Sequence, residues 1–195
     1  MEYAGAVIVG YLLGSIPVSL LVARRHGVDL RSTGDRNPGA WNALEQLGGR
    51  RAAPAFLGDA AKALLAGLAG HALGGWWVAW AAVAAAMVGH ALPAFAGLRG
   101  GKAVMAFVGG GIALSPIAGV AALVLCGVIS AAHSFAWGAR VGVFAFPAIQ
   151  LAVDPVERVA GTGALMCLIG ALFGVAALRR RSARATPGAD AAPRG

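Results

Sequence analysis

Charged residues are scarce in this chain of 195 residues. Asp, Glu, Lys and Arg together make up 12% of the sequence, whereas hydrophobic residues make up 58%, and the mean hydropathy is +0.73. A typical soluble domain carries about 25% charged residues. This composition excludes an ordinary water-soluble globular domain and predicts an integral membrane protein.

Cysteine is almost absent, and no familiar catalytic pattern is present. The two cysteines, Cys126 and Cys167, lie inside apolar runs without a partner motif, so we interpret them as packing residues. The sequence contains no Ser-His-Asp set, no paired carboxylates and no spacing typical of metal ligands. We therefore expect neither a disulfide nor a metal site.

Acidic residues are outnumbered two to one, which leaves a net charge of +8. Such a charge is compatible with nucleic-acid binding. However, the basic residues form clusters between long apolar runs, and this arrangement is typical of the cytoplasmic loops of membrane proteins. We therefore expect membrane lipids, and not nucleic acid, around this protein.

The apolar runs predict an all-α, polytopic bundle of about seven transmembrane helices. The runs are Tyr3–Ala23, Ala52–Leu73, Gly75–Gly97, Ala103–Ala139, Val141–Val153 and Val159–Leu178. A spanning helix needs about 20 residues, so the 37-residue run 103–139 should break, and Pro116 offers the place. Five crossings remain the alternative, because the segments 103–114 and 141–153 are short.

Arginine clusters predict the topology. The stretch Arg24–Arg51 contains six arginines, and the tail beyond Leu178 contains five more, so both should face the cytoplasm. The N-terminus is then outside, Arg140 is cytoplasmic, and Asp154 lies outside. We expect one membrane domain over residues 1–181 and a disordered cytoplasmic tail over 182–195.

Two polar loops on the cytoplasmic face have the composition of an anion site. The first, Gly34–Asn42, combines glycines with two asparagines, although a plain polar turn has the same composition. The second, Gly97–Lys102, leads directly into an apolar helix, and backbone N–H groups at a helix start attract anions. The alternative for this loop is a basic anchor to lipid headgroups.

Two further charged positions lie inside apolar runs. Asp59 and Lys62 are three residues apart, on one face of a helix, and should form a structural ion pair. His90 lies near the end of the third run, where a hydrogen-bonded packing role competes with a direct chemical role.

These motifs together resemble the bacterial acyl-phosphate:glycerol-3-phosphate acyltransferases, a family of small integral membrane enzymes. The resemblance rests on the order and spacing of Gly14-Ser15-Ile16-Pro17, Gly27–Arg31, Gly34–Asn42, Asp59–Lys62, Gly89–Pro93 and Gly100–Lys102. These segments cover most of the first 105 residues. The resemblance implies seven transmembrane helices and active-site loops that face the cytoplasm at the plasma membrane.

The resemblance also implies a reaction. A fatty acyl group would move from acyl phosphate to glycerol 3-phosphate and give lysophosphatidate, without any cofactor. It implies catalytic roles for Asn37, His90 and Lys102. The phosphate-binding residues that it implies are Arg31, Gly39, Asn42, Gly100, Gly101, Lys102 and Arg140.

Several positions depart from the family pattern. Asp35 stands where the family has Ser, Glu45 where it has a substrate-binding Arg, and Val143 where it has Ser. The family's His and Asn beyond the last helix are also missing. The alternative is therefore a non-catalytic homologue that keeps the fold and binds lipid or phosphate, and a transporter is a weaker third interpretation. The oligomeric state is not predicted.

Overall fold

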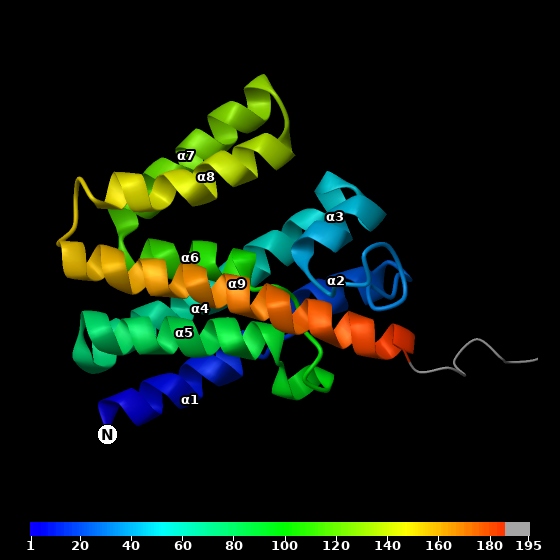
Figure 1. Cartoon of the computed structure of the whole chain (residues 1–195), viewed down its shortest axis with the longest axis horizontal. Coiled ribbons are helices and arrows are strands. Elements are labelled where there is room, and N and C mark those ends of the chain that lie inside the picture. The colour runs from blue at the N-terminus through cyan, green and yellow to red at the C-terminus, as the bar shows by residue number, and fades with distance from the viewer. Residues whose placement is uncertain (186–195) are drawn as a thin grey trace, which may run out of the picture.

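The computed structural model describes residues 1–185, which form nine α-helices and one short 3₁₀ turn, η1 (Figure 1). The helices are α1 (Glu2–Gly14), α2 (Val18–Arg25), α3 (Ala40–Leu47), α4 (Gly49–Gly74), α5 (Trp76–Ala91), α6 (Val104–Leu114), α7 (Pro116–Ala132), α8 (Phe135–Gln150) and α9 (Val156–Ala185), with η1 (Ala94–Ala96) after α5. The all-α membrane fold is thus confirmed.

Four segments of the described chain are long and apolar enough to cross a membrane. They are Glu2–Arg25, Gly49–Gly74, Trp76–Ala96 and Val156–Leu178, and α6 and α7 are shorter apolar helices. Many large hydrophobic side chains on these helices are exposed, among them Leu57 and Val124. Apolar side chains on the outside are expected where a helix faces lipid.

The first apolar run is divided by Pro17. Because proline lacks an N–H and its ring restricts the preceding residue, α1 ends at Gly14 and α2 begins at Val18. On α1, Gly10 and Gly14 pack directly against the backbone of α5. Any Cβ at these glycines would collide with the α5 chain, so small residues allow the two helices to approach closely.

The 37-residue run breaks at the expected place, because α7 begins at Pro116. The division of the apolar region into two runs at Arg140 is wrong, since Arg140 lies inside α8 and does not interrupt it. The chain reverses earlier, at His133 and Ser134, where the Ser134 hydroxyl accepts a hydrogen bond from the Trp137 N–H. An N-cap of this kind satisfies a free donor at a helix start, and it moves the start of α8 upstream.

The last helix is longer than the sequence indicates. α9 extends to Ala185, so residues 182–185, assigned above to a disordered tail, are helical. The remainder of that predicted tail, residues 186–195, lies outside the described residues.

The molecule has two parts. Helices α1, α4, α5 and α6 pack against one another, and α2 and α3 join them through α4. Helices α7 and α8 pack mainly against each other and form a hairpin, with α9 crossing beside α5 and α6 (Figure 1). The loops after α2 and α5 lie at the same end of the bundle (Figure 1), which brings the two candidate anion loops together.

Candidate active site

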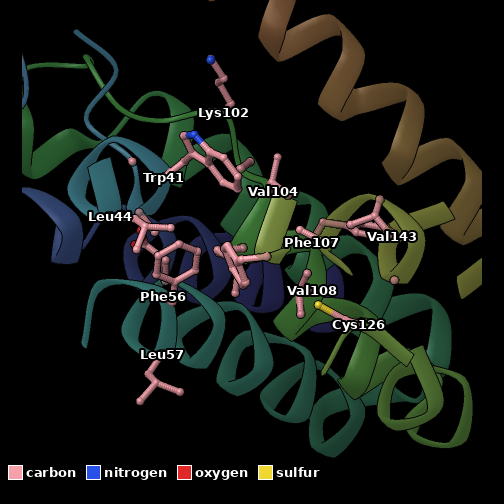
Figure 2. Close-up of a pocket in the computed structure, with 18 of the residues that line it drawn as sticks. Trp41, Leu44, Phe56, Leu57, Lys102, Val104, Phe107, Val108, Cys126 and Val143 are labelled. Atoms are coloured by element: carbon pink, nitrogen blue, oxygen red, sulfur yellow. The ribbon is translucent and has the colours of Figure 1, made fainter. Parts of the chain in front are cut away.

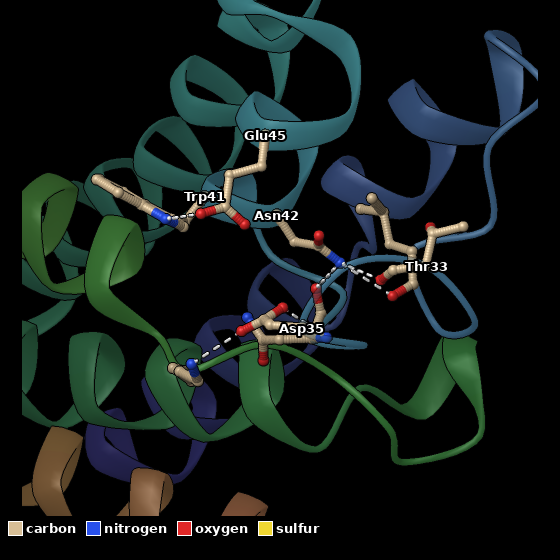
Figure 3. Close-up of polar contacts among 8 residues, drawn as sticks. Thr33, Asp35, Trp41, Asn42 and Glu45 are labelled. Carbon is tan, nitrogen blue, oxygen red and sulfur yellow. Dashed lines mark hydrogen bonds and ion pairs between the residues drawn. The ribbon is translucent and has the colours of Figure 1, made fainter. Parts of the chain in front are cut away.

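The first loop is organised around the Asn42 side chain. Its amide donates hydrogen bonds to the carbonyl oxygens of Leu30, Thr33 and Asn37 at 3.0–3.1 Å (Figure 3). Asn42 is fully buried, and it is placed there by the start of α3. It therefore holds the loop in shape and does not line the cavity described below.

The second loop folds back on the end of α5. The N–H groups of Gly100 and Gly101 donate to the carbonyl oxygens of Ala91 and His90, at 3.0 and 3.2 Å. Ala103, the residue directly before α6, has a positive φ of 60° and turns the chain into that helix. The loop thereby brings Lys102 to the entrance of α6.

Arg31 joins the two loops. Its guanidinium donates to the carbonyl oxygens of Ala96 and Arg99, at 2.5 and 2.8 Å. Arg99 belongs to the loop that carries Lys102, and Ala96 ends the η1 turn directly before that loop. Arg31 was expected to bind phosphate, but the structure engages it with backbone carbonyls, so its contact with the second loop is one of positioning.

A buried charged cluster lies beneath the loops. Asp59 pairs with Lys62 at 2.9 Å and approaches His90 Nδ1 at 3.5 Å. Ser19 donates to the second oxygen of the Asp59 carboxylate at 2.5 Å, and the Lys62 ammonium donates to the carbonyl of Ile16 at 2.9 Å. With exposed fractions of 1% and 5%, Asp59 and Lys62 are removed from solvent, where an ion pair depends on such additional bonds.

His90 and Asn37 both rest against glycines. A Cβ at Gly101 would collide with His90 Nε2, and a Cβ at Gly39 would lie 2.8 Å from Asn37 Nδ2. Gly39 itself lies beside the backbone of Gly101. The two glycines therefore let the loops meet while the imidazole and the amide occupy the space between them.

Lys102 is engaged by a carboxylate. Its ammonium lies 3.2 Å from Asp35 Oδ2 (Figure 3), and 4.9 Å from the centre of the Phe173 ring on α9. The Asn37 N–H donates to the other oxygen, Asp35 Oδ1, at 2.9 Å. Both side chains of the ion pair are partly exposed, with 24% of Lys102 and 35% of Asp35 accessible.

A cavity of about 780 Å³ connects this polar end with an apolar interior (Figure 2). Its size falls in the range of roughly 300–1,000 Å³ that is common for small-molecule pockets. The polar lining comes from Asp35, Asn37, Asp59, His90 and Lys102. The apolar lining comes from α4, α6, α7 and α8 and includes Leu57, Phe107, Val108, Ala122, Cys126, Val143 and Phe146.

Aromatic rings line the cavity between α3 and α8. Trp41 stacks on Phe135 with ring centres 5.8 Å apart, and Phe56 meets the same Phe135 edge-on at 5.5 Å. The indole N–H of Trp41 donates to Glu45 at 2.9 Å (Figure 3). Glu45 therefore orients an aromatic wall, in the position where the family pattern has a substrate-binding arginine.

The structure brings only part of the predicted site to the cavity. Asn37, Gly39, His90 and Lys102 line it. Gly100 and Gly101 shape the loop behind them. Arg140 is exposed on α8, with its guanidinium 5.5 Å from the Trp137 ring, and it is not among the residues that line the cavity.

Sequence reasoning missed several contacts. Ser19 reaches Asp59 across 40 positions, and Phe173 reaches Lys102 from the last helix. No local spacing could have revealed either pair. The motif around Ser15 did offer a signal, and the structure gives its reason, because the Ser15 hydroxyl accepts from the Ala94 N–H just after α5.

Comparisons with known proteins identify the family. The family model described as glycerol-3-phosphate acyltransferase matches residues 4–186. The chain belongs to the glycerol-3-phosphate acyltransferase family.

Curated relatives with the same name support this membership. The glycerol-3-phosphate acyltransferase of Rubrobacter xylanophilus is 42% identical over 66% of this chain and 65% of its own length. The corresponding protein of Geobacter sulfurreducens is 35% identical over 83% of this chain and 84% of its own length.

Two crystal structures share the fold. Both are of PlsY (YgiH), an integral membrane glycerol 3-phosphate acyltransferase, and each superposes with a TM-score of 0.75. The glycerol 3-phosphate form is 28% identical and is aligned over 94% of this chain and 92% of its own. The lysophosphatidic acid form is 26% identical and is aligned over 94% of each chain.

Proposed function

We propose that this protein transfers a fatty acyl group from acyl phosphate to glycerol 3-phosphate. The observation that carries the proposal is the single cavity that joins a polar end containing Lys102 to an apolar interior between α4, α6, α7 and α8. Both substrates carry phosphate and one also carries a fatty chain. A site that binds this pair of substrates needs a polar region for the phosphates that is continuous with an apolar region for the fatty chain.

The acyl transfer needs little acid–base catalysis from ionisable side chains. The glycerol 3-phosphate hydroxyl attacks the carbonyl carbon of the acyl phosphate, the bond from that carbon to the phosphate oxygen breaks, and the proton leaves with inorganic phosphate. Phosphate in a mixed anhydride is already a good leaving group. Holding the two reactants close together and neutralising their charge supplies much of the rate.

Residues at the polar end fit these roles. Lys102 is the one lysine or arginine among the described residues that line the cavity, and the Asn37 side chain lies beside Gly39, where the two loops meet. We assign both to the phosphate groups and His90 to the reacting hydroxyl. The close approach of Gly39 and Gly101 leaves room for the Asn37 amide and the His90 imidazole, which a side chain at either glycine would displace.

The proposed topology has seven crossings, with α1 and α2 counted as one and α3 in the interface. The N-terminus is outside, and both loops face the cytoplasm at the plasma membrane. This orientation rests on arginine placement, since the ends of α2, α4 and α9 near the loops carry arginine clusters. The opposite end carries Glu2, Asp154, Glu157 and one arginine, Arg158.

A second candidate is a homologue without catalysis that binds phosphate or lipid. The contact between Asp35 and Lys102 favours it, because a carboxylate lowers the affinity of an ammonium for a second anion. The two candidates differ in turnover, which a direct assay measures.

The test uses purified full-length protein in lipid nanodiscs with radiolabelled glycerol 3-phosphate. One arm contains palmitoyl phosphate, and a second contains palmitoyl-coenzyme A. We expect labelled lysophosphatidate in the first arm only, and its loss in Lys102→Ala. Product from coenzyme A alone would contradict the proposed donor, and no product in either arm, with binding of glycerol 3-phosphate retained, would support the second candidate.

A further inference from the structure

Asp35 is held at both of its carboxylate oxygens by groups at the polar end of the cavity. The Asn37 N–H donates to Oδ1 at 2.9 Å, and the Lys102 ammonium lies 3.2 Å from Oδ2. The proposed function assigns the Lys102 ammonium to phosphate, and the donor from Asn37 is its backbone N–H, not the side-chain amide. The Asp35 carboxylate is thus an anion that lies between this backbone donor and the Lys102 ammonium (Figure 3).

The segment between α2 and α3 also contains a close counterpart of Asp35, Asp29, for which no contact with a lysine is observed. Asp29 Oδ1 accepts the N–H of Arg31 at 3.0 Å, which is the same bond to the second following residue that Asp35 makes. Asp29 is exposed and is not among the residues that line the cavity. The turn itself therefore does not require an ion pair with lysine, and the position of Asp35 relative to Lys102 is a separate feature.

We propose that Asp35 occupies the position of substrate phosphate in the unliganded protein and sets the affinity of the site for phosphate groups. This inference rests on the proposed function for the identity of the natural ligand. Binding of glycerol 3-phosphate then requires that the carboxylate give up Lys102. Asp35 is an affinity-determining residue and takes no part in bond making.

Charge decides which anion prevails. A phosphate monoester carries about −1.5 to −2 charges at pH 7, whereas a carboxylate carries one. The phosphate therefore displaces Asp35 when its concentration is sufficient, while singly charged carboxylate metabolites compete poorly. Exposure of both side chains weakens the ion pair, so that displacement is an equilibrium and does not block the site.

Asp35→Asn is the informative variant. It keeps an oxygen that accepts the Asn37 N–H but removes the charge that holds Lys102. Asp29→Asn is the matched control, because it removes one negative charge from the same segment between α2 and α3 and preserves the same type of turn. Asp35→Ser, a smaller neutral side chain, is a second route to the same loss of charge.

The measurement is isothermal titration of each purified variant with inorganic phosphate and with glycerol 3-phosphate, without any acyl donor. We expect both ligands to bind on the order of fivefold more tightly to Asp35→Asn and Asp35→Ser, and with unchanged affinity to Asp29→Asn. Thermal unfolding confirms that each variant is folded. Unchanged or weaker binding in both folded Asp35 variants would overturn the inference.

A kinetic readout separates this inference from the proposed function. In the acyl phosphate assay, Asp35→Asn should lower the KM for glycerol 3-phosphate and leave kcat unchanged. A loss of kcat with unchanged KM would overturn the inference, because Asp35 would then act in the reaction. Tighter binding without turnover in any variant, the parent included, would sustain the inference and reject the acyltransferase proposal.

Discussion

The two ends of the cavity are built by different interactions. At the loop end, charged and amide side chains bind backbone carbonyls, as Arg31 and Asn42 do, and a buried ion pair lies beneath them. The α7–α8 hairpin contributes mainly apolar surface, and Phe146 on α8 makes an edge-on contact with Phe107 on α6. Phosphate recognition needs hydrogen-bond donors in fixed positions, whereas a fatty chain needs only an apolar cavity that is long enough to hold it.

This difference predicts that substitutions at the loop end act on stability and charge recognition. Substitutions at the hairpin should act on acyl-chain selection. The following four predictions test the contrast, from the largest expected effect to the smallest.

Asp59→Asn should destabilise the protein most. It leaves the Lys62 ammonium buried without its carboxylate partner, and breaking a buried pair costs about 3–5 kcal/mol. Thermal unfolding in detergent measures the loss, with the exposed Asp29→Asn as control. The double variant Asp59→Asn/Lys62→Met should recover much of the stability, and an unaltered melting temperature in the single variant would refute a supporting role for this pair.

Lys102→Ala should have the largest effect on turnover. Removal of the ammonium leaves the charge of both phosphates unmatched, and we expect a loss of roughly 100- to 1,000-fold in kcat/KM for glycerol 3-phosphate. Lys102→Arg should retain part of the activity, because a planar guanidinium replaces a compact charge. Steady-state kinetics measures both, and full activity in the folded Ala variant would remove Lys102 from the site.

Arg31→Ala should act through the second loop. The carbonyls of Ala96 and Arg99 lose their donor, so Lys102 is less firmly placed, and we expect roughly 10- to 50-fold lower kcat/KM. Arg31→Lys should rescue part of the loss by bonding one carbonyl. The exposed Arg25→Ala serves as control, and an equal fall in that variant would indicate a general effect of charge.

Cys126→Phe should change the preferred acyl chain. Cys126 lies in the apolar lining on α7. A phenyl ring at this position would reduce the cavity volume that is available to the acyl chain. We expect about a fivefold shift in kcat/KM toward shorter acyl phosphates, with the KM for glycerol 3-phosphate unchanged. Cys167→Phe, at an exposed position on α9, is the control and should leave the chain-length profile unaltered.

The loop end could be predicted from sequence to a large extent. Asp59 and Lys62 are three residues apart, and the Gly-Gly-Lys segment leads directly into a helix, so local spacing carried the information. The partners of the individual charges could not be predicted. The Lys102 ammonium that lies 3.2 Å from Asp35 comes from 67 positions away along the chain.

The hairpin end was less predictable. An apolar run indicates a membrane helix, but it does not show where the helix begins or which of its side chains face the cavity. The break at Pro116 was expected, since proline has a defined effect on a helix. The start of α8 was not, because an arginine inside an apolar run resembles a loop. Which side chains of α7 and α8 face the cavity depends on packing between distant helices.

The most direct test of the central claim is photo-crosslinking with an acyl phosphate analogue that carries a diazirine near the end of its chain. Peptide mapping should find label on the apolar lining of α6, α7 and α8, and excess palmitoyl phosphate should prevent it. Lys102→Ala should weaken this labelling. Label confined to exposed residues of α1, insensitive to competition, would contradict a single cavity that binds phosphate at one end and the acyl chain at the other.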